Sequence, residues 1–178
     1  VSQFTTVDAS YFDDALFLGD SHTDGFHDYA GLGNATYFTK NGLTVKDAME
    51  KSFIELDGKK VTLAEALGTR QFGKVYILLG INEIGAYTAA DWAAQYKSLL
   101  DLMREKQPDA VIFIQSIFHT TQKKSDSSYF KNEVINERNA AIAQLADGKT
   151  IFYLDLNPLF DDENGNLRAD ASGDSTHV

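Results

Sequence analysis

Short apolar runs, separated by longer amphipathic stretches, constrain the fold of this chain more than any other sequence feature. Four runs are apolar throughout, at residues 15–18, 75–79, 111–114 and 151–154, and a weaker fifth covers residues 35–39. Continuous rather than alternating apolar residues are typical of parallel strands, which are covered on both faces. The runs therefore predict a five-stranded parallel sheet.

The stretches between the runs have the residue spacing of helices. Residues 89–106 place apolar side chains three and four positions apart and stop before Pro108, and residues 130–146 repeat this pattern. Thr62 and Glu65 form a capping-box pattern, which predicts a short helix that ends near Gly68. Because strands alternate with helices, we expect an α/β fold, a three-layer sandwich with helices on both faces of the sheet.

Residues 53–61 depart from this alternation of predicted strands and helices. They alternate in polarity and contain Asp57-Gly58, a strong hairpin-turn signal, so they predict a small surface hairpin inserted after the second strand. At 178 residues, the whole of 1–178 fits one domain with a core of its own.

Composition excludes several classes of function. The net charge of −10, from 26 acidic and 16 basic residues, disfavours binding to nucleic acid or to anionic lipid. The absence of cysteine excludes disulfides, thiolate zinc sites and a cysteine nucleophile. No apolar run approaches the ~20 residues needed to cross a bilayer. The oligomeric state stays open.

Polar residues suited to acyl-transfer chemistry follow three of the predicted strands. Ser21 lies at a strand-to-helix turn, where backbone N–H groups stabilise negative charge. The Asn82 amide could donate to a developing oxyanion. His177 could take a proton from a serine, and Asp174 could orient its imidazole. Each has a plainer interpretation as a helix cap, a loop amide or part of a solvated tail. At one sheet edge, however, they would make an esterase site.

Three blocks in chain order resemble the GDSL/SGNH hydrolases. Gly19-Asp20-Ser21-His22-Thr23-Asp24-Gly25 is similar to the first block of that family. Gly80-Ile81-Asn82-Glu83 is similar to its third block, Gly-x-Asn-Asp, and Asp174-Ser175-Thr176-His177 to its last, Asp-x-x-His. The resemblance runs from about Asp14 to the end of the chain. It implies a flavodoxin-like fold and a serine esterase that needs no cofactor.

The resemblance also assigns roles. It makes Ser21 the nucleophile, His177 the general base and then acid, and Asp174 the carboxylate that orients His177. The family builds its oxyanion hole from the N–H of the serine, a backbone N–H after the second strand and the Asn of the third block. In this chain these are Ser21, Gly42 or Val45, and Asn82, with Gly42 favoured over Val45.

Two departures from the family pattern affect these expectations. Glu83 stands where the family usually has Asp, which we expect to reshape the nearby pocket. Relatives continue beyond the last block with a closing helix, whereas this sequence ends one residue after His177, so we expect that helix to be missing. The start at Val1, without methionine, is typical of a trimmed chain. The localisation therefore stays open, and one possibility is an extracellular or cell-surface protein whose leader or anchor has been removed.

Three further residues are predicted to line the substrate pocket: His22, Glu83 and His119. A metal site is not expected, because His22 and His27 are five positions apart and do not share a helical face. Residues 161–166 only partly match a calcium loop and are predicted to form a solvated turn.

The leading hypothesis is hydrolysis of carboxylic esters through an acyl-Ser21 intermediate. By analogy with the family, the substrates are small O-acyl groups, such as acetyl, on carbohydrate. One alternative is an O-acyltransferase that uses the same triad. Another is an inactive carbohydrate-binding module, which would not need to keep Ser21, Asp174 and His177 together.

Overall fold

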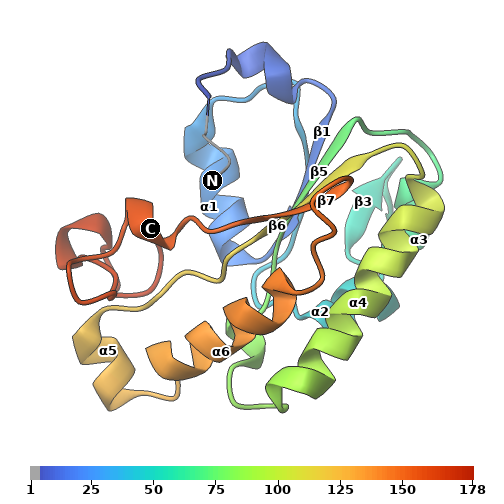
Figure 1. Cartoon of the computed structure of the whole chain (residues 1–178). Helices are drawn as coiled ribbons and strands as arrows, with labels where there is room; N and C mark the ends of the chain where they lie inside the picture. The colour runs from blue at the N-terminus through green and yellow to red at the C-terminus, as the bar shows by residue number, and fades with distance from the viewer. Residues whose placement is uncertain (1–4) are drawn as a thin grey trace.

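A five-stranded, all-parallel sheet forms the centre of the computed structural model, which describes residues 5–178. Its strand order is β2-β1-β5-β6-β7 (Figure 1). The strands are β1 (Ala15–Gly19), β2 (Thr36–Thr39), β5 (Lys74–Leu78), β6 (Val111–Gln115) and β7 (Ile151–Leu154). All five fall on the predicted apolar runs, so the predicted α/β fold and parallel sheet are confirmed.

Helices cover both faces of the sheet, but unequally. One face carries α1 (Ser21–Ala30), and the other carries α2 (Val45–Glu50), α3 (Leu63–Leu67), α4 (Ala89–Lys106) and α6 (Asn132–Ala143) (Figure 1). The larger core lies on the second face, where Trp92, Tyr96 and Leu99 of α4 are fully buried beneath the strands. Helix α4 has the predicted bounds, whereas α6 is shorter at both ends than predicted.

The face toward α1 carries a row of aromatic rings, one from each strand. Phe17 of β1 stacks on Tyr76 of β5 with ring centroids 4.8 Å apart, and Tyr76 stacks on Phe113 of β6 at 4.7 Å. Tyr37 and Phe152 extend the row to the two edge strands. Because the strands pair in register at these residues, the row crosses the whole sheet.

Shorter elements complete the chain. The predicted hairpin is present as β3 (Ile54–Leu56) and β4 (Lys59–Val61), with positive φ at both Asp57 and Gly58 as its tight turn requires. The remaining elements are α5 (Gln122–Ser127) and four 3₁₀ turns, η1 (Ala9–Phe12), η2 (Ile81–Glu83), η3 (Asn157–Leu159) and η4 (Ala169–Ala171). The loops at the carboxyl ends of β1, β2 and β5, together with the segment that follows β7, carry the candidate site.

Candidate active site

The turn between β1 and α1 presents Ser21 as the first residue of the helix. The Asp20 carboxylate caps this helix by accepting a hydrogen bond from the backbone N–H of His22 at 3.0 Å. Gly19 must lack a side chain, because a Cβ there would lie 2.0 Å from Thr23 Oγ1 and 2.7 Å from the Leu78 carbonyl oxygen. The turn is therefore tight, and it places the Ser21 hydroxyl at the end of the sheet.

Ser21, His177 and Asp174 form one hydrogen-bonded chain. Ser21 Oγ lies 2.8 Å from His177 Nε2, although the two residues are 156 positions apart in the sequence. His177 Nδ1 lies 2.5 Å from Asp174 Oδ2. The other carboxylate oxygen, Asp174 Oδ1, accepts hydrogen bonds from the backbone N–H groups of Thr176 (2.9 Å) and His177 (2.8 Å). The Asp-x-x-His spacing thus orients carboxylate and imidazole within a single turn of chain.

The charge of Asp174 determines which atoms donate and which accept in the hydrogen bonds from Ser21 through His177 to Asp174. Burial alone would raise the pKa of its carboxyl, but hydrogen bonds from the His177 backbone and ring and from the Thr176 N–H lower that pKa well below its usual value of 3.8. Asp174 is therefore ionised at neutral pH and accepts a hydrogen bond from His177 Nδ1–H. Nε2 is left free to accept a hydrogen bond from the Ser21 hydroxyl.

Asn82 lies beside the nucleophile turn. Its side-chain amide donates to Asp20 Oδ2 at 3.1 Å and to the Leu43 carbonyl at 3.2 Å. It therefore ties the loop after β5 to the loop after β2. These two loops and the start of α1 supply the three groups that the sequence assigned to an oxyanion hole.

The two candidate amides after β2 differ in their availability. The Val45 N–H is buried and donates to Glu83 Oε2 at 3.1 Å. Gly42 is exposed and has φ of 73°, in a turn closed by a hydrogen bond of 3.0 Å from the Leu43 N–H to the Lys40 carbonyl. This positive φ favours glycine. The N–H of Val45 is therefore already bound within the protein, whereas Gly42 lies in an exposed turn.

Glu83 lies inside the protein rather than in the pocket where the sequence placed it. It is 3% exposed, and its Oε2 also accepts a hydrogen bond from the Trp92 indole N–H at 3.1 Å. Among the described residues its other oxygen, Oε1, has no partner. Burial raises the pKa of this carboxyl, against the opposing effect of its two hydrogen bonds and of Arg138. Glu83 therefore braces the loop after Asn82 instead of contacting substrate.

His119 also lies in the interior. Its Nδ1 is 2.8 Å from Asp161 Oδ2 and its Nε2 is 2.9 Å from Asn136 Oδ1. Both ring nitrogens are thus occupied within the protein, and the ring holds the loop after β6 against α6 and the C-terminal loop. The third candidate, His22, does border a hollow, and its ring contacts Asp20 and Thr176.

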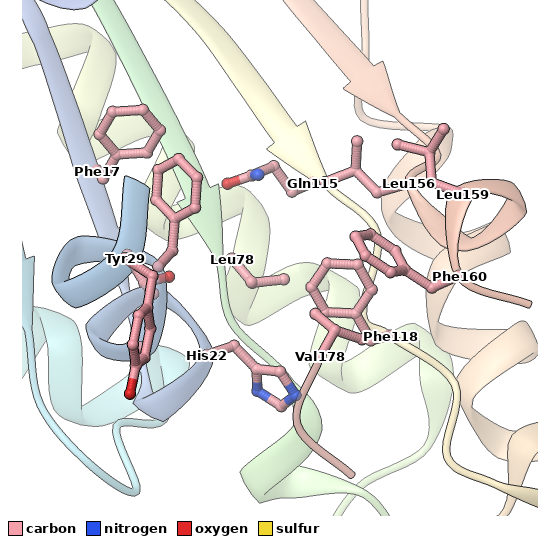
Figure 2. A pocket seen from close by; sticks show the side chains of 13 residues that line it. Phe17, His22, Tyr29, Leu78, Gln115, Phe118, Leu156, Leu159, Phe160 and Val178 are labelled. Carbon is pink, nitrogen blue, oxygen red and sulfur yellow. The ribbon is translucent and has the colours of Figure 1, made fainter. Parts of the chain in front are cut away.

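That hollow has a volume of about 320 Å³ and lies between α1, the sheet and the loop at η3 (Figure 2). Its walls are mostly apolar: Phe17, Phe26, Leu78, Phe118, Leu156 and Phe160. His22 and Val178 border it near the triad, whereas Ser21 and His177 are not among its lining residues. The hollow thus adjoins the triad without containing the nucleophile.

Arg138 is a supporting residue that the sequence did not reveal. It is 2% exposed, lies over the Trp92 ring at 5.1 Å, and donates to the carbonyls of Tyr87 and Thr88. It thereby fixes the loop that follows Asn82 and Glu83. The one sequence feature that could have indicated this role is that Arg138 is a lone arginine among the residues of α6 that face the core.

The part of the chain that the structure describes offers no group of three or more histidine, aspartate or glutamate side chains placed to hold a metal ion. The His27 ring stacks on that of Tyr37, with ring centroids 4.1 Å apart. Within residues 5–178, no helix has the length and apolar character to span a membrane.

The chain belongs to the GDSL-like lipase/acylhydrolase family, whose profile matches residues 17–178. This confirms the resemblance carried by the three sequence blocks and makes the protein a member of a hydrolase family. A comparison with curated protein sequences gives no match.

Solved structures share the fold at low sequence identity. A protein from Streptococcus pneumonia, provisionally named a platelet activating factor, has a TM-score of 0.73 at 18% identity over 96% of this chain and 83% of that chain. A GDSL-like lipase from Bacteroides thetaiotaomicron has a TM-score of 0.66 at 17% identity, over 92% and 78% of the two chains. A carbohydrate esterase family 3 protein from Talaromyces cellulolyticus has a TM-score of 0.60 at 17% identity, over 92% and 86%.

Proposed function

We propose that the protein is a serine esterase that cleaves carboxylic esters through an acyl-Ser21 intermediate. The observation that carries this proposal is the hydrogen-bonded chain from Ser21 Oγ to His177 Nε2 (2.8 Å) and from His177 Nδ1 to Asp174 (2.5 Å). A serine, a base that can accept its proton and a carboxylate that orients the base are the parts such a reaction needs.

Each residue has a defined part in the reaction. Ser21 Oγ attacks the ester carbonyl while His177 Nε2 takes the hydroxyl proton, and the carbonyl oxygen becomes an oxyanion. The N–H groups of Ser21 and Gly42 and the amide of Asn82 stabilise that oxyanion. As the intermediate collapses, His177 gives its proton to the leaving alcohol. Water, activated by His177, then attacks the acyl-serine and releases the acid.

For the substrate, we propose small O-acyl groups, such as acetyl, on carbohydrate. In the part of the chain that the structure describes, the His177 and Asp174 side chains lie at the surface, 43% and 57% exposed. Structural neighbours include the carbohydrate esterase family 3 protein and an acetyl esterase solved with an acetate ion, at a TM-score of 0.61. These likenesses motivate the choice of substrates to test.

The test begins with hydrolysis of p-nitrophenyl acetate and longer acyl esters. We expect Ser21→Ala to abolish turnover, while Ser98→Ala, a change of an exposed serine on α4, leaves it intact. Equal turnover by the wild type and Ser21→Ala would contradict the proposal. A panel of acetylated glycans then tests the substrate class.

The same triad could pass the acyl group to a sugar hydroxyl instead of water. Adding saccharide acceptors separates the two reactions, because an acyltransferase makes an acceptor-dependent product. The alternative of an inactive binding module is disfavoured by the triad geometry, since binding alone does not require a hydrogen-bonded Ser-His-Asp chain. Glycan binding without turnover would support that alternative.

A further inference from the structure

The ring of His22 links the nucleophile turn to the chain segment that carries the catalytic base. Its Nδ1 lies 3.3 Å from Asp20 Oδ1, and its Nε2 lies 3.1 Å from the backbone carbonyl of Thr176. Thr176 immediately precedes His177, and His22 immediately follows Ser21. One imidazole therefore spans the two segments whose side chains must meet for the proposed reaction.

Both partners of the His22 ring are acceptors. A backbone carbonyl can only accept, so Nε2 carries a hydrogen. Asp20 is 1% exposed, and its carboxylate oxygens accept hydrogen bonds from the His22 backbone N–H and from Asn82. With Nδ1 only 3.3 Å from Asp20 Oδ1, the geometry suits a hydrogen on Nδ1 as well as on Nε2, which is the arrangement of an imidazolium.

The charges around His22 favour this state. Asp20 contacts the ring from the nucleophile turn, and Asp174 and His177 face it from the C-terminal segment. Burial lowers the pKa of His22, but the hydrogen bond and charge of Asp20, the Thr176 carbonyl and the charge of Asp174 together raise it above the usual 6.5. The His177 ring centroid lies 4.5 Å from that of His22, so the proposed base stands directly beside this ring.

We propose that His22 is a positioning residue that, as a buried cation, clamps the Asp174–His177 segment against the Ser21 turn, and that loss of its proton loosens the triad. This inference rests on the proposed function for its kinetic consequence, but the charge state and the clamp are properties of the folded chain. Since the pKa is raised, the clamp is complete below about pH 6.5 and weakens as pH rises through the raised pKa of His22, because a neutral ring keeps the Nε2–H bond to Thr176 but loses the Nδ1–H contact with Asp20. Esterase activity should then fall on the alkaline side.

Imidazole NMR of the wild-type protein tests the charge state without reference to activity. The chain has four histidines, so their ring nitrogens can be assigned by single substitutions. We expect both His22 nitrogens to be protonated at pH 6, the ring to titrate with a midpoint above the usual 6.5, and the backbone amide signals of Thr176 and His177 to shift as it titrates. A midpoint at or below 6.5, or a titration that leaves those amides unmoved, would overturn the proposal even if the esterase activity is real.

The kinetic test compares pH profiles. We expect His22→Gln to lower kcat by about 10²-fold through misplacement of His177, with a smaller change in KM, and to remove the alkaline limb. His27→Gln, a change on the exposed face of the same helix, should keep the wild-type profile. If the His22→Gln variant keeps the wild-type fall in activity at alkaline pH, deprotonation of His22 is not the cause of that fall, and the proposal is wrong. If the wild type has no esterase activity, the proposed function fails, while the NMR result still decides the state of His22.

Discussion

The side chain of Asn82 and the carboxylate of Asp20 are joined by a hydrogen bond of 3.1 Å, although they follow different strands. The second amide hydrogen of Asn82 reaches the Leu43 carbonyl at 3.2 Å. The candidate oxyanion donor is therefore oriented before any substrate binds. A developing oxyanion would compete for the hydrogen now given to Leu43, because a negatively charged oxygen is a better acceptor than a neutral carbonyl.

Replacing Asn82 with alanine should impair catalysis more than binding. We expect kcat to fall about 10²–10³-fold with little change in KM, since the lost donor acts mainly in the transition state. Steady-state kinetics check this. Asn34→Ala is the matched control, because Asn34 also donates to an aspartate, Asp13 at 3.2 Å, but on the exposed surface. A drop of the same size in both variants would contradict the assignment.

Replacing Asp174 with asparagine should slow turnover by about 10³–10⁴-fold, because an amide no longer fixes the His177 tautomer. The change should also alter acid stability. The pKa of Asp174 is lowered in the folded protein, so its ionised form stabilises the fold above pH 3.8, and this contribution is lost as pH falls below that value. Denaturant unfolding measured from pH 3 to pH 7 should show the free energies of unfolding of the wild type and the variant approaching each other as the pH falls. A difference between the two free energies that stays constant over this range would contradict the prediction.

Replacing Glu83 with glutamine tests the buried carboxyl next to Asn82. The pKa of Glu83 is raised by burial, so the wild-type free energy of unfolding should decline as pH rises above 4.5 through that raised pKa. Glutamine does not titrate, and its carbonyl can still accept from Val45 and Trp92. The variant should therefore lack this decline and keep kcat within a few-fold of the wild type. Glu55→Gln, on the exposed hairpin, should show the wild-type pH dependence; identical curves for all three proteins would refute the prediction.

Alanine at Gly80 should destabilise the protein by about 2–3 kcal/mol, through overpacking and backbone strain. A Cβ there would lie 2.5 Å from Ile117 Cδ1 and 2.6 Å from Trp92 Cζ2, and the residue has φ of 134°. Alanine at Gly25 provides the contrast, because that glycine lies inside α1 with no atom within 4 Å of a built Cβ. It should stabilise the helix by up to about 1 kcal/mol. Thermal unfolding of both variants measures the difference, and a Gly80→Ala protein as stable as the wild type would contradict the packing argument.

The sheet, the hairpin and the long helix could be predicted because each follows from a local pattern. Continuous apolar runs predicted the five strands, Asp57-Gly58 the turn and the spacing of Trp92 and Tyr96 the helix α4. The short helices α2 and α5 were not predicted, because six residues are too few to establish a helical period.

The roles of the loop residues were harder to predict than their positions. Glu83 and His119 fall at the expected strand ends, yet both point inward. Their directions depend on partners far along the chain, such as Val45 for Glu83 and Asp161 for His119. A motif places a residue in a loop, but only tertiary packing decides whether its side chain meets ligand or protein.

Trp92 is the only tryptophan in the chain, and its indole N–H binds the residue that follows Asn82. Its fluorescence therefore comes from one fully buried position behind the loop that carries Asn82 and Glu83. A rearrangement of that loop, or a change in the ionisation of Glu83, would alter the polarity around the indole and shift its emission. The protein thus has an intrinsic optical probe, without any label, for the loop on which its proposed chemistry depends.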